Sequence, residues 1–561
     1  MISRDAGGRI GRINISGKKI KTPCIAIVVN PNKMTLSIKE LKKAGVELII
    51  TNAYIILRSK FREEIEEKGL HKFFKWKGLI YTDSGTYQMF SRNIRDIDNK
   101  TMVEFQEKIG SDFVTPVDVF TTPHDSYEEA EKKLTETIKR IREAREFTKK
   151  LVCPIQGGVF TKLRKKACKE LYSISPRVFA IGGIVPLMNS YDYSRLVDIV
   201  LTCKENLPSN IPVHAFGAGH PITFALLVAC GVDIFDSAMY AIAAQENRYL
   251  TPYGTKSLNE LNEFPCSCRV CSKYTPAELF SMEKSEKERI LALHNLYVTL
   301  EEIKRIREAI RENSLWELLQ IRVRVHPKIL FAFREILKKH AKYFMEHDMF
   351  PKTRGVFYSG KETLLRPEIK KAKKKLSYIN KRKSKTIKLV PFGEIPKDLY
   401  PAYPFLHFEG FEEKKEIVEW KNYFRLLLSY QFGKGAEKEI KDFELKFSKT
   451  GKPREVVANG KAIGIIHPET GFFIPNIHGA LMLKRFLKKV FVKKEAEEYV
   501  KSGRDLLAKF AFTNDKVFPG EIVCIYNEEN EVIACGIALL NSKEINEFNY
   551  GKAIKVKDTV H

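Results

Sequence analysis

The chain lacks any apolar stretch long enough to span a bilayer, which takes about 20 residues. Its first residues, Met1-Ile2-Ser3-Arg4-Asp5, also lack the basic and apolar segments of a secretory signal peptide. The pattern of a membrane-spanning or exported protein is therefore absent. We expect a cytoplasmic protein with no membrane partner.

Cysteine is scarce, with ten in 561 residues, and most are widely separated. That number is too small and too scattered for a scaffold held together by disulfides. Three of them crowd into residues 266–271, which indicates metal binding in a reducing compartment.

Acidic residues are outnumbered, with 69 Asp and Glu against 96 Lys and Arg, so the net charge is +27. Such a surface attracts polyanions, and it favours nucleic acid over an anionic membrane surface as the partner. The length is too great for one hydrophobic core, and about 150 residues per domain predicts three or four domains.

Residues 24–236 alternate short β-rich runs with amphipathic helical stretches such as 126–149 and 193–207. Eight repeated units of this kind predict a (β/α)8 barrel, with a doubly wound open sheet of similar content as the alternative. The eight β-rich runs are residues 24–29, 47–51, 78–83, 113–118, 151–156, 178–182, 212–217 and 232–236.

Polar residues and glycines stand at the ends of these runs, where a barrel gathers its reactive side chains. Carboxylates and an amide meeting at one mouth can hold the edge of a purine-like ring, and glycines leave room for a flat base. Taken singly, Asp83 can instead cap the following turn, and each glycine pair can be an ordinary tight turn. The residues concerned are Asn52, Asp83, Asp118, Gln156, Gly157, Gly158, Gly182, Gly183, Gly217, Ala218, Gly219, His220 and Asp236.

A second cluster follows the barrel, where Cys266, Cys268 and Cys271 precede a helical stretch with His294. Three thiolates and one imidazole make a closed tetrahedral set, which is typical of a structural Zn²⁺ site. The alternative is three buried free cysteines, for which the C-x-C-x-x-C spacing offers no packing reason.

Beyond residue 345 the βα pattern stops. Residues 370–388 hold ten Lys or Arg and no acid, which indicates either a solvated helix face or a phosphate contact. Residues 451–475 predict a small β-rich unit with a hairpin turn at Asn459-Gly460. Residues 490–560 predict a compact β-rich module.

These motifs, in this order and spacing, resemble the archaeal tRNA-guanine transglycosylase family over nearly the whole chain. The resemblance implies a catalytic barrel with its zinc site over 1–345, small α+β domains over 346–405 and 406–488, and an RNA-binding PUA domain over 489–561. The motifs that carry it are Asp83-Ser84-Gly85 with Gln88, residues 216–221, residues 234–238, and the three cysteines with His294.

The family resemblance also implies an activity, namely exchange of guanine 15 in the tRNA D-loop for 7-cyano-7-deazaguanine, an early step toward archaeosine. It further implies a homodimer with one structural zinc per chain. Two other readings stay open: an archaeosine synthase-like or inactive tRNA-binding paralogue, and a relative that acts on DNA. The presence of both Asp83 and Asp236 argues against the first, and the PUA-like segment argues against the second.

By the same resemblance, Asp83 and Asp236 are the catalytic pair. Exchange of a base with retention takes a double displacement, in which one carboxylate attacks C1′ and another group carries the proton. The resemblance implies Asp236 as nucleophile and Asp83 as acid/base, although the reverse assignment also exists within the family. The residues implied to bind the base are Asp118, Gln156, Gly182 and Gly183. The chain departs from the family at residues 119–123 and at Gly183, where some relatives have Ala.

Overall fold

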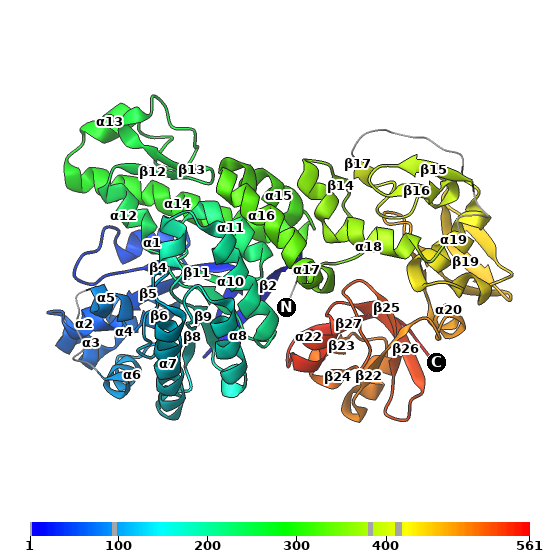
Figure 1. The fold of residues 1–561 in the computed structure, drawn as a ribbon, viewed down its shortest axis with the longest axis horizontal. Helices are drawn as coiled ribbons and strands as arrows, with labels where there is room; N and C mark the ends of the chain where they lie inside the picture. The colour runs from blue at the N-terminus through cyan, green and yellow to red at the C-terminus, as the bar shows by residue number, and fades with distance from the viewer. Residues whose placement is uncertain (1–2, 92–97, 380–384, 410–417, 561) are drawn as a thin grey trace.

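A computed structural model describes residues 3–91, 98–379, 385–409 and 418–560. Figure 1 shows the barrel as one half of the molecule, with its strands in blue to green, and the C-terminal elements in yellow to red as the other half. Within the described residues, no helix is both long and apolar enough to cross a membrane.

Eight parallel strands form one sheet in the order β7-β6-β5-β4-β11-β10-β9-β8. The two ends of this order meet through a parallel bridge between Val114 and Leu151, so the sheet is closed. The predicted barrel is confirmed, and the open-sheet alternative is wrong. The strands are β4 (Cys24–Val28), β5 (Leu48–Asn52), β6 (Leu79–Asp83), β7 (Phe113–Val114), β8 (Val152–Ile155), β9 (Val178–Ile181), β10 (Val213–Ala215) and β11 (Ile234–Ser237).

Helices cover the outside of this barrel (Figure 1). The longest crossover helix is α7 (Tyr127–Phe147). Its N-cap is Ser126, whose hydroxyl accepts from the backbone N–H of Glu129 in a capping box. Its buried face includes Leu134, Ile138 and Ile141, at the spacing of one helical stripe. The main helices of the barrel are α1 (Ile38–Ala44), α6 (Asn99–Lys108), α7 (Tyr127–Phe147), α8 (Thr161–Glu170), α10 (Tyr193–Asn206), α11 (Pro221–Ala229), α12 (Met239–Gln245) and α14 (Lys284–Arg311).

An antiparallel sheet of β1 (Ser3–Asp5), β2 (Gly8–Ile15) and β3 (Lys18–Thr22) precedes the barrel. Ile15 and Ile20 from this sheet belong to the cluster of buried side chains inside the barrel, together with Leu48, Tyr81 and others. This sheet was not predicted from the sequence.

Among the described residues, the C-terminal half contains two two-stranded sheets and two larger ones. A four-stranded sheet includes β19 (Pro453–Ala458) and β20 (Lys461–Ile466), joined at Asn459-Gly460, where both residues have positive φ as predicted for this hairpin. A six-stranded sheet in the order β23-β27-β26-β25-β22-β24 forms the C-terminal module. Its strands are β22 (Lys488–Val492), β23 (Leu506–Leu507), β24 (Ala511–Phe512), β25 (Ile522–Tyr526), β26 (Val532–Ala538) and β27 (Lys552–Thr559). The domain boundaries stay predictions.

The basic run 370–388 lies partly on α18 (Pro367–Leu376), and its residues 380–384 are outside the described part. Three of its lysines turn inward. Lys370 donates to the carbonyl of Leu337, Lys371 to that of Asp348, and Lys375 to that of Gln431. These three ammonium groups therefore hold protein backbone, and among the described residues of α18 only Lys373 and Lys374 are exposed lysines.

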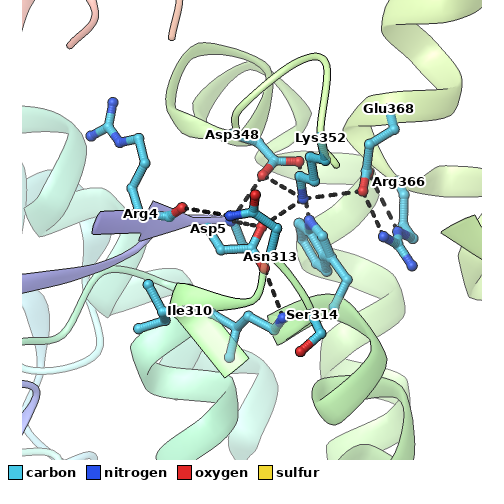
Figure 2. A network of polar contacts seen from close by, with 12 residues as sticks. Arg4, Asp5, Ile310, Asn313, Ser314, Asp348, Lys352, Arg366 and Glu368 are labelled. Atoms are coloured by element: carbon cyan, nitrogen blue, oxygen red, sulfur yellow. Dashed lines mark hydrogen bonds and ion pairs between the residues drawn. The ribbon is translucent and has the colours of Figure 1, made fainter. Parts of the chain in front are cut away.

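A buried charge cluster ties the barrel to the C-terminal half (Figure 2). The Lys352 ammonium, with a side chain 1% exposed, lies 2.6 Å from Asp5, 2.9 Å from Asp348 and 3.2 Å from Glu368. Arg366 pairs with Glu368 from its other side. Burial raises the pKa of Asp5 to about 7, and the nearby charge of Asp348 acts in the same direction.

We expect Lys352→Met to destabilise the protein by about 3–5 kcal/mol, because it leaves the buried carboxylates without their shared cation. Thermal or urea unfolding against the wild type measures the loss. Lys373→Met is the matched control, since Lys373 is exposed on α18. Equal unfolding midpoints for wild type and Lys352→Met would show that the cluster adds nothing to stability.

Candidate active site and metal centre

A cavity of about 1170 Å³ opens at the carboxyl ends of the barrel strands. This is the rim at which the sequence analysis expected the site. The residues implied by the resemblance all line it, namely Asp83, Asp118, Gln156, Gly182, Gly183 and Asp236.

Asp83 is the last residue of β6, and it lies beside Asn52, the last residue of β5. The Asn52 amide donates to Asp83 Oδ2 at 3.0 Å and to Gln88 Oε1 at 2.9 Å. Burial, with the nearby charges of Asp118 and Asp236, raises the pKa of Asp83 to about 7. Asp83 can therefore hold or release a proton near neutral pH.

Asp118 and Gln156 form one hydrogen-bonded unit on the cavity wall. Gln156 Nε2 donates to Asp118 Oδ2 at 2.5 Å, and the Thr121 hydroxyl donates to Gln156 Oε1 at 2.7 Å. Burial raises the pKa of Asp118, while the bond from Gln156 opposes that rise. These contacts set the amide orientation of Gln156, so the wall presents fixed donors and acceptors.

Two glycines lie beside this pair, Gly182 and Gly183. A Cβ on Gly182 would lie 2.6 Å from Gln156 Nε2, and Gly183 has a φ of +69°. A side chain at either position would displace Gln156 or strain the backbone. The two glycines therefore keep the wall thin and flat.

Asp236 lies on β11 and is held from behind. Its Oδ1 accepts from His214 Nε2 at 2.9 Å and from the backbone N–H of Gly217 at 2.6 Å. His214 is fully buried, and its Nδ1 lies 3.3 Å from the Tyr81 hydroxyl. With Nε2 donating to the carboxylate, Nδ1 accepts from Tyr81. Two donors on one oxygen stabilise the negative charge of Asp236.

His214 was not among the site residues predicted from the sequence. Side chains alternate along a strand, so His214 on β10 shares the inner face with Phe216 two residues on. That alternation was the available signal, but the partner of His214 depends on the neighbouring strand β11.

The predicted metal ligands come together outside the barrel. Ligand atoms of Cys266, Cys268, Cys271 and His294 all lie within 4.8 Å of one another. His294 Nδ1 is 3.4 Å from Cys268 Sγ and 3.2 Å from Cys271 Sγ. This cluster can hold a metal ion.

The surroundings of His294 suit that role. Its Nε2 donates to the Leu250 carbonyl at 3.0 Å, which leaves Nδ1 as the ligand nitrogen. Tyr249 stacks on the imidazole with ring centroids 3.8 Å apart. Because His294 lies on α14, a bound metal would fasten the cysteine loop to a helix of the barrel.

Comparison with known protein families assigns three segments of the chain. Residues 5–328 match the family described as queuine tRNA-ribosyltransferase. Residues 422–489 match the patch-forming domain C2 of tRNA-guanine transglycosylase, and residues 488–560 match the PUA domain.

Curated relatives are similar over nearly the whole chain. The tRNA-guanine(15) transglycosylase of Pyrococcus furiosus is 42% identical, over 99% of this chain and 96% of the relative. Those of Thermococcus onnurineus and Methanocaldococcus jannaschii are 42% and 39% identical, over 99% of this chain and 98% of each relative. The chain belongs to the tRNA-guanine transglycosylase family.

Proposed function

We propose that this transferase, whose family exchanges guanine in tRNA, replaces guanine 15 of the D-loop by 7-cyano-7-deazaguanine. The observation that carries the proposal is the pair Asp83 and Asp236, two carboxylates in different environments on one cavity. An inactive or DNA-acting relative lacks comparable support, because both carboxylates are present and the C-terminal segment matches an RNA-binding module.

In this proposal Asp236 is the nucleophile. Its Oδ1 is occupied by His214 and Gly217, so Oδ2 is the oxygen available to attack C1′. Attack forms the C1′–O bond and breaks the bond from C1′ to the guanine ring nitrogen, which leaves a covalent glycosyl-enzyme.

Asp83 serves as the acid and then the base. With its pKa raised to about 7, it can carry the proton that neutralises the departing guanine. The same carboxylate then takes a proton from the incoming 7-cyano-7-deazaguanine, whose ring nitrogen attacks C1′ and releases Asp236.

The base-binding wall is assigned to Asp118, Gln156, Gly182 and Gly183. Asp118 is suited to accept from the ring N–H and amino groups of a guanine-like base, and Gln156 to contact the same edge. The glycines leave room for the ring plane. The shared hydrogen bond of 2.5 Å keeps Asp118 and Gln156 in register for this edge.

For the metal cluster we propose one structural Zn²⁺ per chain. Three thiolates and an imidazole match the preference of zinc for sulfur and nitrogen, and four protein ligands leave no open position for a reacting water. The metal would stabilise the loop that carries the cysteines and take no part in the exchange.

We also propose that two chains assemble as a homodimer, which rests on the family resemblance. Light scattering should then give a mass near twice the 64.6 kDa of one chain. A mass of one chain under the conditions of the activity assay would contradict the dimer.

Asp236→Asn and Asp83→Asn should each lower base exchange by about 10³-fold or more, because each removes one half of the double displacement. Affinity for tRNA should change little, since phosphate contacts supply most of it. Exchange of radiolabelled guanine into tRNA and a filter-binding assay measure the two quantities. Asp442→Asn, at an exposed position outside the cavity, is the control.

A covalent intermediate tests the two roles separately. Wild-type protein incubated with tRNA and denatured should retain an RNA adduct, and peptide mapping should place it on Asp236. An adduct mapped to Asp83 would reverse the roles, and no loss of exchange in either variant would exclude the two-carboxylate mechanism.

The kcat/KM for tRNA should fall as the pH rises above about 7, because Asp83 must be protonated to neutralise the departing base. A pH profile of initial rates measures this. A rate that stays level up to pH 9 would contradict the assignment of Asp83 as the acid.

Stability gives an independent check on the same group. The pKa of Asp83 in the folded protein is raised. The contribution of its neutral form to the stability of the fold is therefore fully present below the ordinary pKa of 3.8, and it is lost as the pH rises through about 7. Asp83→Asn mimics the neutral form. We expect it to unfold at a higher temperature than wild type at pH 8, and at nearly the same temperature at low pH.

Metal analysis should find about one zinc per chain, lost in Cys271→Ser. Removal should loosen the cysteine loop, which limited proteolysis detects, before it affects the barrel. Cys230→Ala is the matched control, because Cys230 is buried on the barrel and is not part of the cluster. Fully active protein without metal and with an intact loop would exclude the structural role.

A further inference from the structure

Exposed tyrosines gather at the mouth of the active-site cavity. Among the described residues, four tyrosines are more than half exposed, and three of them line this cavity. They are Tyr87 at 54%, Tyr191 at 51% and Tyr253 at 58%. About half of each ring stays in contact with solvent, and a gathering of such rings at one opening points to a ligand.

Tyr191 is the most firmly held of the three. Its ring lies parallel to that of His326, with centroids 5.1 Å apart and planes 4° apart. The buried Tyr193 packs edge-on against both rings. His326 is itself fixed at the start of α16 (Pro327–Lys339), where its Nδ1 accepts from the backbone N–H of Lys328.

The backbone at Tyr191 supports a functional role. Its φ is +57°, in the left-handed region that a bulky residue other than glycine seldom adopts. Asparagine or glycine would fit this position with less strain, so the cost of the tyrosine needs a compensating use. Lys328 places its ammonium 5.8 Å from the centre of the same ring, which adds a cation beside the aromatic surface.

The proposed reaction creates a need for such a surface. A base that enters the cavity leaves its stack, and the bases on either side of it lose a stacking neighbour. Those flanking nucleotides stay at the mouth because the sugar-phosphate chain links them to the extruded one. Aromatic side chains replace lost base stacking in a way that tolerates any sequence.

We propose that Tyr191, supported by His326, stacks on the base of a nucleotide next to the exchanged guanosine. Lys328 then lies beside the phosphate of that flanking nucleotide. This inference rests on the proposed function, because it requires the guanosine to be extruded into the cavity. It adds a binding site for a flanking nucleotide to the site that holds the exchanged base.

Tyr191→Asn is the main test, because asparagine tolerates the left-handed backbone and removes the ring. We expect its KM for tRNA to rise about tenfold, the scale of one lost base stack. The KM for the free base should stay unchanged. Tyr191→Phe keeps the ring and should recover the affinity. Phe447→Asn, at a residue of equal 51% exposure outside the cavity, is the control.

A fluorescent probe locates the contact. A tRNA transcript with 2-aminopurine on one or other side of the exchanged guanosine should lose fluorescence on binding wild type through stacking, and should lose less on binding Tyr191→Asn. Equal KM and equal quenching in wild type and Tyr191→Asn would overturn the inference.

The other possible results distinguish a failure of the flanking site from a failure of the proposed function. If Tyr191→Asn changes the mass in solution and leaves the quenching intact, Tyr191 is a contact between protein chains and the inference is wrong. If wild type itself exchanges no guanine in tRNA, the proposed function fails first. If wild type is active and only the Tyr191 result is negative, the failure belongs to the flanking site alone.

Discussion

The short parallel pairing of Val114 with Leu151 closes the barrel, and the pairing of Asp118 with Gln156 on the cavity wall depends on it. Asp118 follows Val114 by four residues, and Gln156 follows Leu151 by five. Closure therefore brings these two side chains from opposite ends of the strand order to a hydrogen bond of 2.5 Å. In an open sheet the same residues would stand at its two edges. Closure also gathers Asp83 and Asp236 on the same rim.

The cavity brings three carboxylates together, and the surrounding groups distinguish them. Asp236 has two donors on one oxygen, whereas Asp83 is influenced mainly by burial and the charges of its neighbours. Asp118 is oriented by Gln156. Three residues of one type therefore stand in three different environments on one cavity.

The first strand links the barrel to the C-terminal half. Successive side chains of β1 point in opposite directions, so Arg4 and Asp5 serve different partners. Arg4 forms a buried pair with Glu544 in the C-terminal module, with one contact of 2.8 Å, and Asp5 joins the cluster around Lys352. The amino end of the barrel is thus anchored to both C-terminal parts, while its carboxyl rim stays open for substrate.

What the sequence determined by itself was local. Alternating patterns predicted all eight barrel strands, the Asn459-Gly460 turn requires the positive φ that both residues adopt, and the spacing of three cysteines indicated a metal cluster. Each depends on residues close along the chain, or on one repeated period. The reactive rim followed because a barrel has only one carboxyl end.

The tertiary structure alone decided which side chains meet. The contact of His214 with Asp236 needs two neighbouring strands in register. The ion pair of Lys352 with Asp5 joins two residues that are more than 300 positions apart in the sequence. In the sequence Lys371 and Lys375 belong to a basic run, yet in the structure they donate to backbone carbonyls of other segments. Charge and periodicity describe each segment separately, and burial depends on which other segment packs against it.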